Sequence, residues 1–291
     1  MRQKISVIIT AFKEPRTIAR AVSSIAEQKV ADEIIVVAPD EETLDEAKKL
    51  DIKEVRVLKD KGEGKPVALN LAVREAKGAI LILTDGDVFV GKDSLKYLIR
   101  EMKDAKVGAV SGRPIPINSR KNMLGYWAHL LTSIANERRR KSLKIGRRFF
   151  CSGYLFAIRK DIFPSLRKDI LSDDGFISQR IYERGFKISY SANSKVYVKY
   201  PTTINDWIKQ KKRSAGGYNQ IKKITGIEMR SFKKESLGGF GVLKYAMNLK
   251  EIFWLVLLFG FRVYLWFLIY KDINFKKKSH KDVWVRIEST K

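Results

Sequence analysis

Short apolar segments alternate with helix-forming segments over the first 105 residues of this 291-residue chain. Apolar runs of four to six residues are typical of strands that are buried on both faces of a sheet. Their alternation with helices predicts an α/β fold in which a mostly parallel sheet is flanked by helices. In such sheets ligands bind beyond the carboxyl ends of the strands. The predicted strands are residues 5–10, 34–38, 55–58 and 79–84, and the predicted helices are residues 15–28, 41–50, 66–77 and 94–105.

The alternation is less regular after residue 108, where apolar patterning still predicts further strands and helices. We find no internal repeat and no low-complexity linker that would separate independent domains. The predicted strands are residues 107–113, 154–159 and 195–200, and the predicted helices are residues 123–141 and 173–185.

Residues 252–270 differ from the rest of the chain because they carry a single charge, Arg262. As a helix this segment nearly matches the ~30 Å hydrocarbon core of a bilayer. A buried core helix is the alternative, but aromatic residues near both ends favour membrane contact. Arg262 opposes burial at the bilayer centre by roughly 2.5–3.5 kcal/mol, so a tilted, re-entrant or interfacial helix stays open beside a span. Both flanks are basic and give no orientation; they contain Lys244, Lys250, Lys271 and Lys276 to Lys278.

The formal net charge of +26 is concentrated in the later part of the chain. Residues 1–116 carry a net charge of only +2, whereas residues 117–170 carry +10 and residues 199–291 carry +13. A thermophile-like composition adds both signs and does not explain this excess. The charge indicates a polyanionic partner, which leaves nucleic acid, nucleotide phosphates and an anionic membrane as candidates.

Two carboxylates follow the most apolar predicted strand. Asp85 and Asp87 are two residues apart at the carboxyl end of that strand, where they can share one divalent cation. Oxygen ligands suit Mg²⁺ or Mn²⁺, with diphosphate oxygens completing the shell. The alternative is an ordinary turn, because Asp-Gly-Asp is a common turn composition. The one cysteine and two distant histidines make no zinc pattern that would compete with this site.

A helix is predicted to begin near Lys65, twenty residues before Asp85. A lysine at a helix N-terminus can meet a phosphate group. The segment is not a P-loop, because no Ser or Thr follows the lysine and the glycine spacing differs. Gly62 and Gly64 lack the third glycine of a dinucleotide fingerprint.

Taken together and in this order, these motifs resemble the family 2 inverting glycosyltransferases with the GT-A fold, including membrane-associated polysaccharide and glycolipid synthases. The matching positions extend from residue 5 to residue 217. They are residues 6–14, 34–40, Gly64-Lys65-x-x-Ala68-Leu69-Asn70, Thr84-Asp85-Gly86-Asp87, Gly153, Asp173-Asp174 with Gly185, and Gln210-Lys211-Lys212-Arg213.

The resemblance implies a nucleotide-sugar site at the carboxyl ends of the strands. Thr10, Glu14 and Asp40 would lie at the base and ribose, although Asp40 is also a possible helix N-cap. Asp85 would contact the ribose and metal region, and Asp87 would coordinate the cation on the donor diphosphate. Lys65 and Asn70 would either contact the donor or organise the loop.

Asp174 matches the general base of the family, with Asp173 beside it. One carboxylate near the acceptor hydroxyl removes its proton as the oxygen attacks the anomeric carbon, and this single displacement inverts the configuration. No second carboxylate is needed as a nucleophile. The family usually has Glu-Asp here, so the shorter Asp173 leaves the role of the first acid open. A helix start that favours acids through its dipole is the alternative reading.

Gln210 and Arg213 resemble the Gln-x-x-Arg-Trp motif of the family. Arg213 would neutralise the leaving diphosphate, as a bidentate phosphate contact can. The usual Trp is replaced by Ser214, which puts a processive polymerising activity in doubt. Without the other motifs, a basic stretch on a solvated helix would be the default interpretation.

A membrane surface accounts best for the charge that the donor site leaves unexplained. The predicted helix at 123–141 has apolar residues on one face and leads into a basic cluster at 137–148, a combination that suits an anionic membrane. Nucleic acid is a minor candidate, because no nucleic-acid-binding motif accompanies the charge. The apolar residues of this helix are Leu124, Trp127, Leu130, Leu131 and Ile134.

We therefore expect a membrane-associated inverting glycosyltransferase that uses Mg²⁺ or Mn²⁺ and a nucleotide-diphosphate sugar. Residues 1–110 would bind the nucleotide sugar, residues 111–225 would bind the acceptor and carry catalysis, and residues 226–291 would contact the membrane. The acceptor would be a lipid-linked sugar, a glycolipid or a polysaccharide, reached from the cytoplasmic side. The alternatives are a sugar-nucleotide nucleotidyltransferase, whose Gly-rich N-terminal loop is missing, and a nucleic-acid-binding protein.

Overall fold

The computed structural model describes residues 3–226, 240–274 and 287–290 and divides into two compact units. The first unit comprises Met1–Ile115 and Asn136–Lys199, and the second comprises Pro116–Ala135 and Tyr200–Thr290. The first unit contains the sheet and the predicted donor-binding residues other than Gln210 and Arg213. The second is helical and contains the long apolar segment of the sequence analysis.

The first unit is built on a mixed sheet of eight strands in the order β3-β2-β1-β4-β7-β6-β8-β5. Its first four strands pair in parallel, and β7 joins β4 and β6 antiparallel, as β5 joins β8. The predicted α/β class is confirmed, and the sheet is parallel in its N-terminal half only. The strands are β1 Ile5–Thr10, β2 Glu33–Ala38, β3 Val55–Lys59, β4 Ile80–Asp85, β5 Val88–Val90, β6 Val107–Pro116, β7 Leu155–Arg159 and β8 Lys187–Val198.

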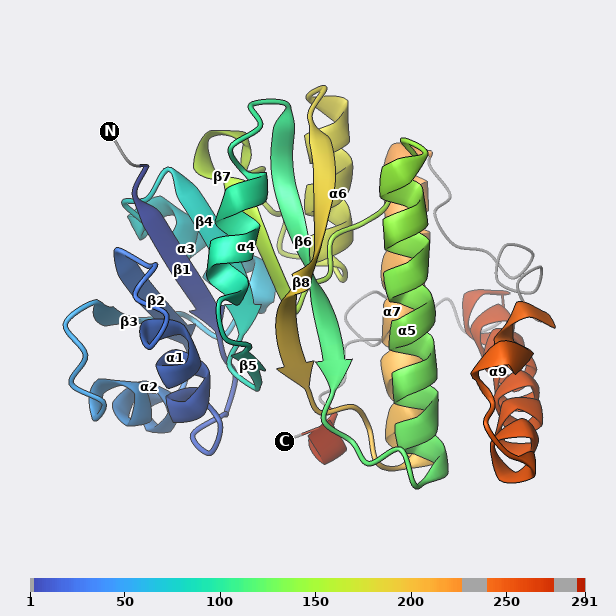
Figure 1. The fold of residues 1–291 in the computed structure, drawn as a ribbon. Coiled ribbons are helices and arrows are strands. Elements are labelled where there is room, and N and C mark those ends of the chain that lie inside the picture. The colour runs from blue at the N-terminus through green and yellow to red at the C-terminus, as the bar shows by residue number, and fades with distance from the viewer. Residues whose placement is uncertain (1–2, 227–239, 275–286, 291) are drawn as a thin grey trace. The chain divides into compact units, whose positions relative to one another are not determined.

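Helices cover both faces of this sheet, with α4 in front of it and α6 behind it in the view of Figure 1. The side chains of β1 are buried along its whole length, and those of β2 and β4 are buried at all but one position each. Burial on both faces explains why the sequence of these strands is continuously apolar. The helices of this unit are α1 Ile18–Ala26, α2 Glu41–Lys48, α3 Lys65–Glu75, α4 Ser94–Glu101, η1 Lys160–Ile162 and α6 Asp173–Glu183.

The strand predicted at residues 195–200 is wrong in its start, because β8 begins at Lys187. Its inward positions include serines, which hide the apolar alternation that marks a half-buried strand. These serines are nevertheless buried and bonded: Ser194 Oγ donates to the carbonyl of Ser94 at 2.9 Å, and Ser189 Oγ donates to Glu101. Hydrogen bonds to neighbouring elements thus replace apolar packing along this strand.

The second unit is formed by helices that pack around a cluster of aromatic and aliphatic side chains. α5 Met123–Lys144 crosses from the second unit into the first, whereas α7 Ile204–Thr225 and α9 Leu249–Asn274 belong to the second alone. α7 is not among the elements predicted from the sequence. Short helices η2 Phe240–Tyr245 and η4 Glu288–Thr290 complete the described part. The buried centre of the cluster is Tyr126, Trp127, Leu130, Trp207, Leu255 and Leu258.

The apolar face of α5 is packed inside the protein, which corrects its assignment to a membrane surface. Trp127 and Leu130 are in the centre of the cluster, and Leu124, Leu131 and Ile134 pack against it. The periodicity correctly identified an apolar face, but it could not show that α7 and α9 cover this face. Most of the exposed large apolar side chains of the second unit lie on α9 instead.

Candidate active site

The carboxyl ends of β1 and β4 bring Thr10 and Asp85 together in the first unit. The two residues are direct partners in the parallel register. Thr10 Oγ1 donates a hydrogen bond to Asp85 Oδ1 at 3.2 Å. Ligand sites of α/β sheets form at this edge, so two of the predicted donor residues, Thr10 and Asp85, lie where the fold supports binding.

The Asp85-Gly86-Asp87 turn is packed closely against Glu14. The N–H of Gly86 donates to the carbonyl of Thr10 at 2.9 Å, and a Cβ at Gly86 would lie 2.5 Å from Glu14 Oε2. Only glycine therefore permits this approach of the buried Glu14 carboxylate. Asp87 follows on the turn and is half-buried. The sequence predicted these acids but not the requirement for glycine between them.

Lys65 joins this turn to the start of α6. Its Nζ lies 2.6 Å from Asp85 Oδ1 and 3.4 Å from Asp173 Oδ2. Burial acts to lower the pKa of Lys65, but the carboxylates of Asp173, Asp85 and Asp174 outweigh it and hold this pKa well above its usual value. The lysine is therefore a fixed positive charge, and it sits on α3 directly after Gly64, whose φ of +107° strongly favours glycine.

Burial raises the pKa of Asp173 above its usual value. The charge of Lys65 opposes this shift, and the neighbouring carboxylates of Asp174 and Asp85 reinforce it. Three carboxylates thus surround one ammonium group, and the cluster attracts further positive charge when all three are ionised.

Asp174 is held in one orientation by three hydrogen bonds. Its Oδ1 accepts from Ser172 Oγ at 2.7 Å and from the N–H of Gly175 at 2.8 Å, and its Oδ2 accepts from the N–H of Gly153 at 3.1 Å. A carboxylate fixed in this way has a defined direction for taking a proton from a bound hydroxyl. Ser172 was not predicted as a site residue, and its only sequence signal is its place two residues before the acid at a helix start.

The loop that carries Gly153 is anchored at the two residues that precede this glycine. The N–H of Cys151 donates to Ser178 Oγ and the N–H of Ser152 donates to Ser111 Oγ, both at 2.9 Å. These bonds fix the backbone that donates to Asp174, so the orientation of the carboxylate depends on β6 and α6 together.

Asp40 and Asn70 have structural partners. Asp40 is the N-cap of α2: it accepts from the N–H of Thr43 and also from the N–H of Lys13 at 2.8 Å. Burial acts to raise the pKa of Asp40, but these hydrogen bonds outweigh it and lower the value. Asn70 donates to the carbonyl of Leu166 at 2.7 Å and accepts from its N–H at 3.0 Å, which favours the loop-organising alternative.

Asp85 and Asp87 are the side chains that could hold a divalent cation. In the part of the chain that the structure describes, no group of three or more His, Cys, Asp or Glu residues has the arrangement of a metal site. The described residues therefore supply too few protein ligands for a closed metal site. Two carboxylates with diphosphate oxygens and water do suit Mg²⁺ or Mn²⁺, which commonly bind through few protein ligands and a substrate phosphate.

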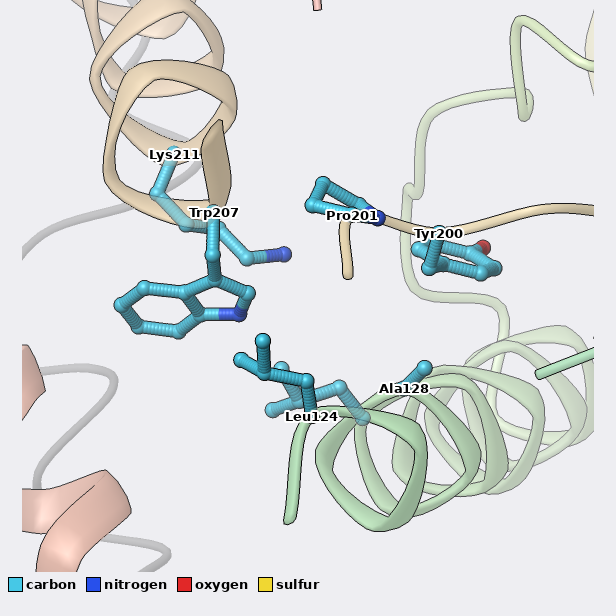
Figure 2. Close-up of a pocket in the computed structure, with 7 residues that line it drawn as sticks. Leu124, Ala128, Tyr200, Pro201, Trp207 and Lys211 are labelled. Atoms are coloured by element: carbon cyan, nitrogen blue, oxygen red, sulfur yellow. The ribbon is translucent and has the colours of Figure 1, made fainter. Parts of the chain in front are cut away.

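Gln210 and Arg213 lie in the second unit, one turn apart on α7, and are half-buried. The same helix lines a narrow apolar pocket, into which Trp207 and Lys211 point in Figure 2. The basic residue of the pocket, Lys211, directly follows Gln210 in the sequence. The other residues that line the pocket are Leu124, Ala128, Leu131, Tyr200 and Pro201.

Comparison with curated proteins places this chain among glycosyltransferases. Residues 2–217 match the model of the glycosyltransferase-like family 2. The chain is 25% identical over 231 residues to the poly-beta-1,6-N-acetyl-D-glucosamine synthase of Staphylococcus aureus strain COL, covering 75% of this chain and 55% of the synthase. It is 30% identical over 168 residues to the probable glycosyltransferase YdaM of Bacillus subtilis strain 168, covering 55% of this chain and 39% of that protein. The chain thus spans about half the length or less of these relatives.

Solved structures with a similar fold are also glycosyltransferases. A mannosyltransferase from Pyrobaculum calidifontis in complex with GDP-Man and Mn²⁺ has a TM-score of 0.58 at 20% identity, covering 75% of this chain and 62% of its own. The glucosyl-3-phosphoglycerate synthase of Mycobacterium tuberculosis in complex with Mn²⁺ and UDP-glucose has a TM-score of 0.56 at 16% identity, covering 77% and 80%. At these identities the likeness shows the fold. Together with the family match, it means that this chain has a GT-A-like fold and belongs to glycosyltransferase family 2.

Proposed function

We propose that the protein transfers a sugar from a nucleotide-diphosphate sugar to an acceptor hydroxyl with inversion at the anomeric carbon. The observation that carries the proposal is the fixed carboxylate of Asp174, which lies beside the chain of contacts from Asp85 through Lys65 to Asp173. This arrangement connects the turn expected to bind the donor diphosphate with the residue expected to activate the acceptor.

In the proposed reaction, the acceptor oxygen forms a bond to the anomeric carbon as the bond to the diphosphate oxygen breaks. Asp174 takes the proton of the acceptor hydroxyl, and the nucleoside diphosphate leaves with the electron pair. A single displacement with one base needs no carboxylate nucleophile. Thr10, Glu14 and Asp40 would bind the nucleoside end of the donor at the carboxyl edge of the sheet.

The negative charge of the leaving diphosphate needs positive partners. A Mg²⁺ or Mn²⁺ ion bound by Asp85 and Asp87 would supply charge neutralisation there. The complexes of the similar mannosyltransferase and glucosyl synthase with Mn²⁺ support this assignment. Arg213, with Gln210 beside it, would add a charge-assisted contact to the diphosphate.

We also propose that the enzyme works at the cytoplasmic surface of a membrane on a lipid-linked sugar, a glycolipid or a growing polysaccharide. The described residues contain one helix that is long and apolar enough to cross a bilayer, Leu249–Lys271. Only 17% of its most apolar 18-residue stretch is buried inside the protein. The similarity to a polysaccharide synthase supports a saccharide acceptor. Nucleotide sugars are available in the cytosol, which favours that side.

The Asp174→Asn variant tests the catalytic proposal once a thermal-shift screen of nucleotide sugars with Mg²⁺ or Mn²⁺ has identified a donor. The single amide oxygen can still accept the two hydrogen bonds made to Oδ1 of Asp174, but the amide cannot take the proton. We expect transfer to fall by about 10²–10⁴-fold, while metal-dependent donor binding stays within about twofold.

The matched control for this test is Asp169→Asn, because Asp169 is an exposed acid that pairs with Arg167 at 2.8 Å. This variant should transfer sugar at the normal rate. Normal turnover by Asp174→Asn would remove Asp174 as the base, and retention of configuration in the product would overturn the single displacement.

A further inference from the structure

Helix α9 has one face packed into the second unit and one face exposed. On the packed face, Leu255, Leu258, Leu265 and Ile269 are each at most 9% exposed. On the opposite face the side chains are large, apolar and open to solvent. They include Leu249, Val256, Val263, Phe267 and Tyr270, with exposed fractions of 84%, 64%, 44%, 60% and 63%.

The packed face is held by polar as well as apolar contacts. Trp127 Nε1 donates to the carbonyl of Trp254 at 2.8 Å, and the rings of Trp127 and Trp207 both contact Phe261 edge-on. At the start of the helix, Arg120 makes two hydrogen bonds to the Glu251 carboxylate, at 3.1 and 3.2 Å. These contacts fix α9 along α5 and α7.

This docking is incompatible with a helix that crosses a bilayer. Phe261 lies near the middle of the Leu249–Lys271 segment and packs on Trp207 of α7. If α9 spanned the membrane, Trp207 would lie near the bilayer centre, together with the basic residues of the next turns of α7. Charged side chains at that depth are strongly disfavoured. These residues are Lys209, Lys211, Lys212 and Arg213.

The exposed face instead suits the interface of a membrane that contains anionic lipids. It is too large an apolar surface to face water without a function. Lys244, Lys250 and Lys271 are exposed around the two ends of the helix, where they can meet lipid phosphates. Charge and apolar area therefore point to the same occupant, a leaflet with anionic headgroups.

We propose that α9 lies in the plane of an anionic membrane, docked on α5 and α7, and inserts only its exposed face to the boundary of headgroups and acyl chains. This inference rests on the membrane location proposed above and replaces a possible span by an interfacial helix. The catalytic proposal is independent of it.

Single-cysteine labelling of the full chain distinguishes the two orientations. In a Cys151→Ala background, which removes a buried thiol, cysteine replaces Leu249, Val256, Val263 or Tyr270 one at a time. These positions are seven residues apart, so they form one stripe that runs about 30 Å along the helix. Each labelled protein is bound to vesicles of phosphatidylcholine with phosphatidylglycerol, and its nitroxide depth is measured.

An in-plane helix gives four similar, shallow depths, and an impermeant thiol reagent outside the vesicles modifies all four positions. A spanning helix would place Val256 and Val263 deepest, with Leu249 and Tyr270 modified from opposite sides, and would overturn the inference. A reference label at Lys48→Cys on α2, an exposed position, gives the nitroxide signal of a side chain in water.

A second measurement tests whether the exposed face binds the membrane. The combined Val256→Ser, Val263→Ser and Phe267→Ser variant should weaken vesicle binding by more than about tenfold. The control combines Leu143→Ser and Ile145→Ser, two exposed apolar residues of the first unit, and should bind normally. The inference is overturned if the parent chain does not bind vesicles, or if the chain self-associates through α9 and does not bind vesicles. In either case, sugar transfer to a soluble acceptor still tests the catalytic proposal separately.

Discussion

The two units depart from the usual arrangement of soluble proteins in opposite ways. The first partly buries a cluster of charges: the side chains of Lys65, Asp85 and Asp173 are only 29%, 23% and 17% exposed. The second exposes apolar surface, along one face of α9. Buried charges cost desolvation energy and exposed apolar groups forfeit burial, so neither feature is explained by folding alone. Each departure marks a surface where we propose that a ligand binds, a nucleotide sugar in one unit and lipid in the other.

The largest expected effect comes from removing the ammonium group of Lys65 in the first unit. Lys65→Met leaves three neighbouring carboxylates without their ammonium partner, so we expect the free energy of unfolding to fall by about 2 kcal/mol and donor binding to weaken by at least about tenfold. Chemical denaturation and donor titration measure the two changes.

Lys168→Met is the matched control for this lysine. Lys168 pairs with Glu63 at 2.9 Å, but both side chains are largely exposed, so its loss should cost less than about 0.5 kcal/mol. Equal effects of the two variants would mean that the cluster around Lys65 has no special energetic weight.

Glycine substitutions give the next largest contrast between the units. Gly86→Ala would bring a methyl group within 2.5 Å of Glu14 Oε2 and 2.8 Å of Ala11 Cβ, and we expect a loss of about 1–3 kcal/mol. Gly260→Ala on α9 meets nothing within 4 Å, and it should stabilise the helix by about 0.5–1 kcal/mol. Unfolding midpoints of the two variants should therefore move in opposite directions, and a neutral Gly86→Ala would show that the turn accommodates a side chain.

The fold could be predicted best where the signal was local. The runs of β1, β2 and β4 are apolar because both faces of each strand are covered, and the strand–helix alternation was sufficient to find them. The antiparallel return of β7 and the early start of β8 depend on pairing between distant segments, which no local pattern records.

The candidate site shows the same limit. The motifs identified Lys65, Asp85 and Asp173, but spacing along the chain could not show that one ammonium contacts both acids, because Lys65 and Asp173 are 108 residues apart. Likewise, the identity of Asn70 suits a donor contact or a loop-organising role, and its hydrogen bonds to the backbone of Leu166, 96 residues away, favour the second. Long-range hydrogen bonds, and not residue identity, separate these two roles.

The smallest expected effect concerns how folding stability depends on pH. The contributions of one acid in each unit should change with pH in opposite directions. Burial raises the pKa of Asp173 above the ordinary 3.8, so the proton is held more tightly in the folded state. Its contribution to stability is therefore present below about pH 4 and is lost as the pH rises through the raised value. Burial also acts to raise the pKa of Glu251, but hydrogen bonds from Arg120 and the N–H of Met247 outweigh it and lower the value below 4.5. The contribution of Glu251 is present above about pH 4.5 and is lost as the pH falls through the lowered value.

Two isosteric variants test this contrast, because Asp173→Asn and Glu251→Gln remove titration with little change of shape. The stability of the parent chain relative to Asp173→Asn should decline as the pH rises above about 4. Relative to Glu251→Gln, it should instead decline as the pH falls from about 5 to 3. Unfolding free energies measured over that range decide the matter, and the same sign for both variants would contradict the proposed environments. Opposite signs would mean that burial favours the protonated form of Asp173 in the first unit, whereas hydrogen bonds from Arg120 and the N–H of Met247 favour the ionised form of Glu251, the acid that docks α9.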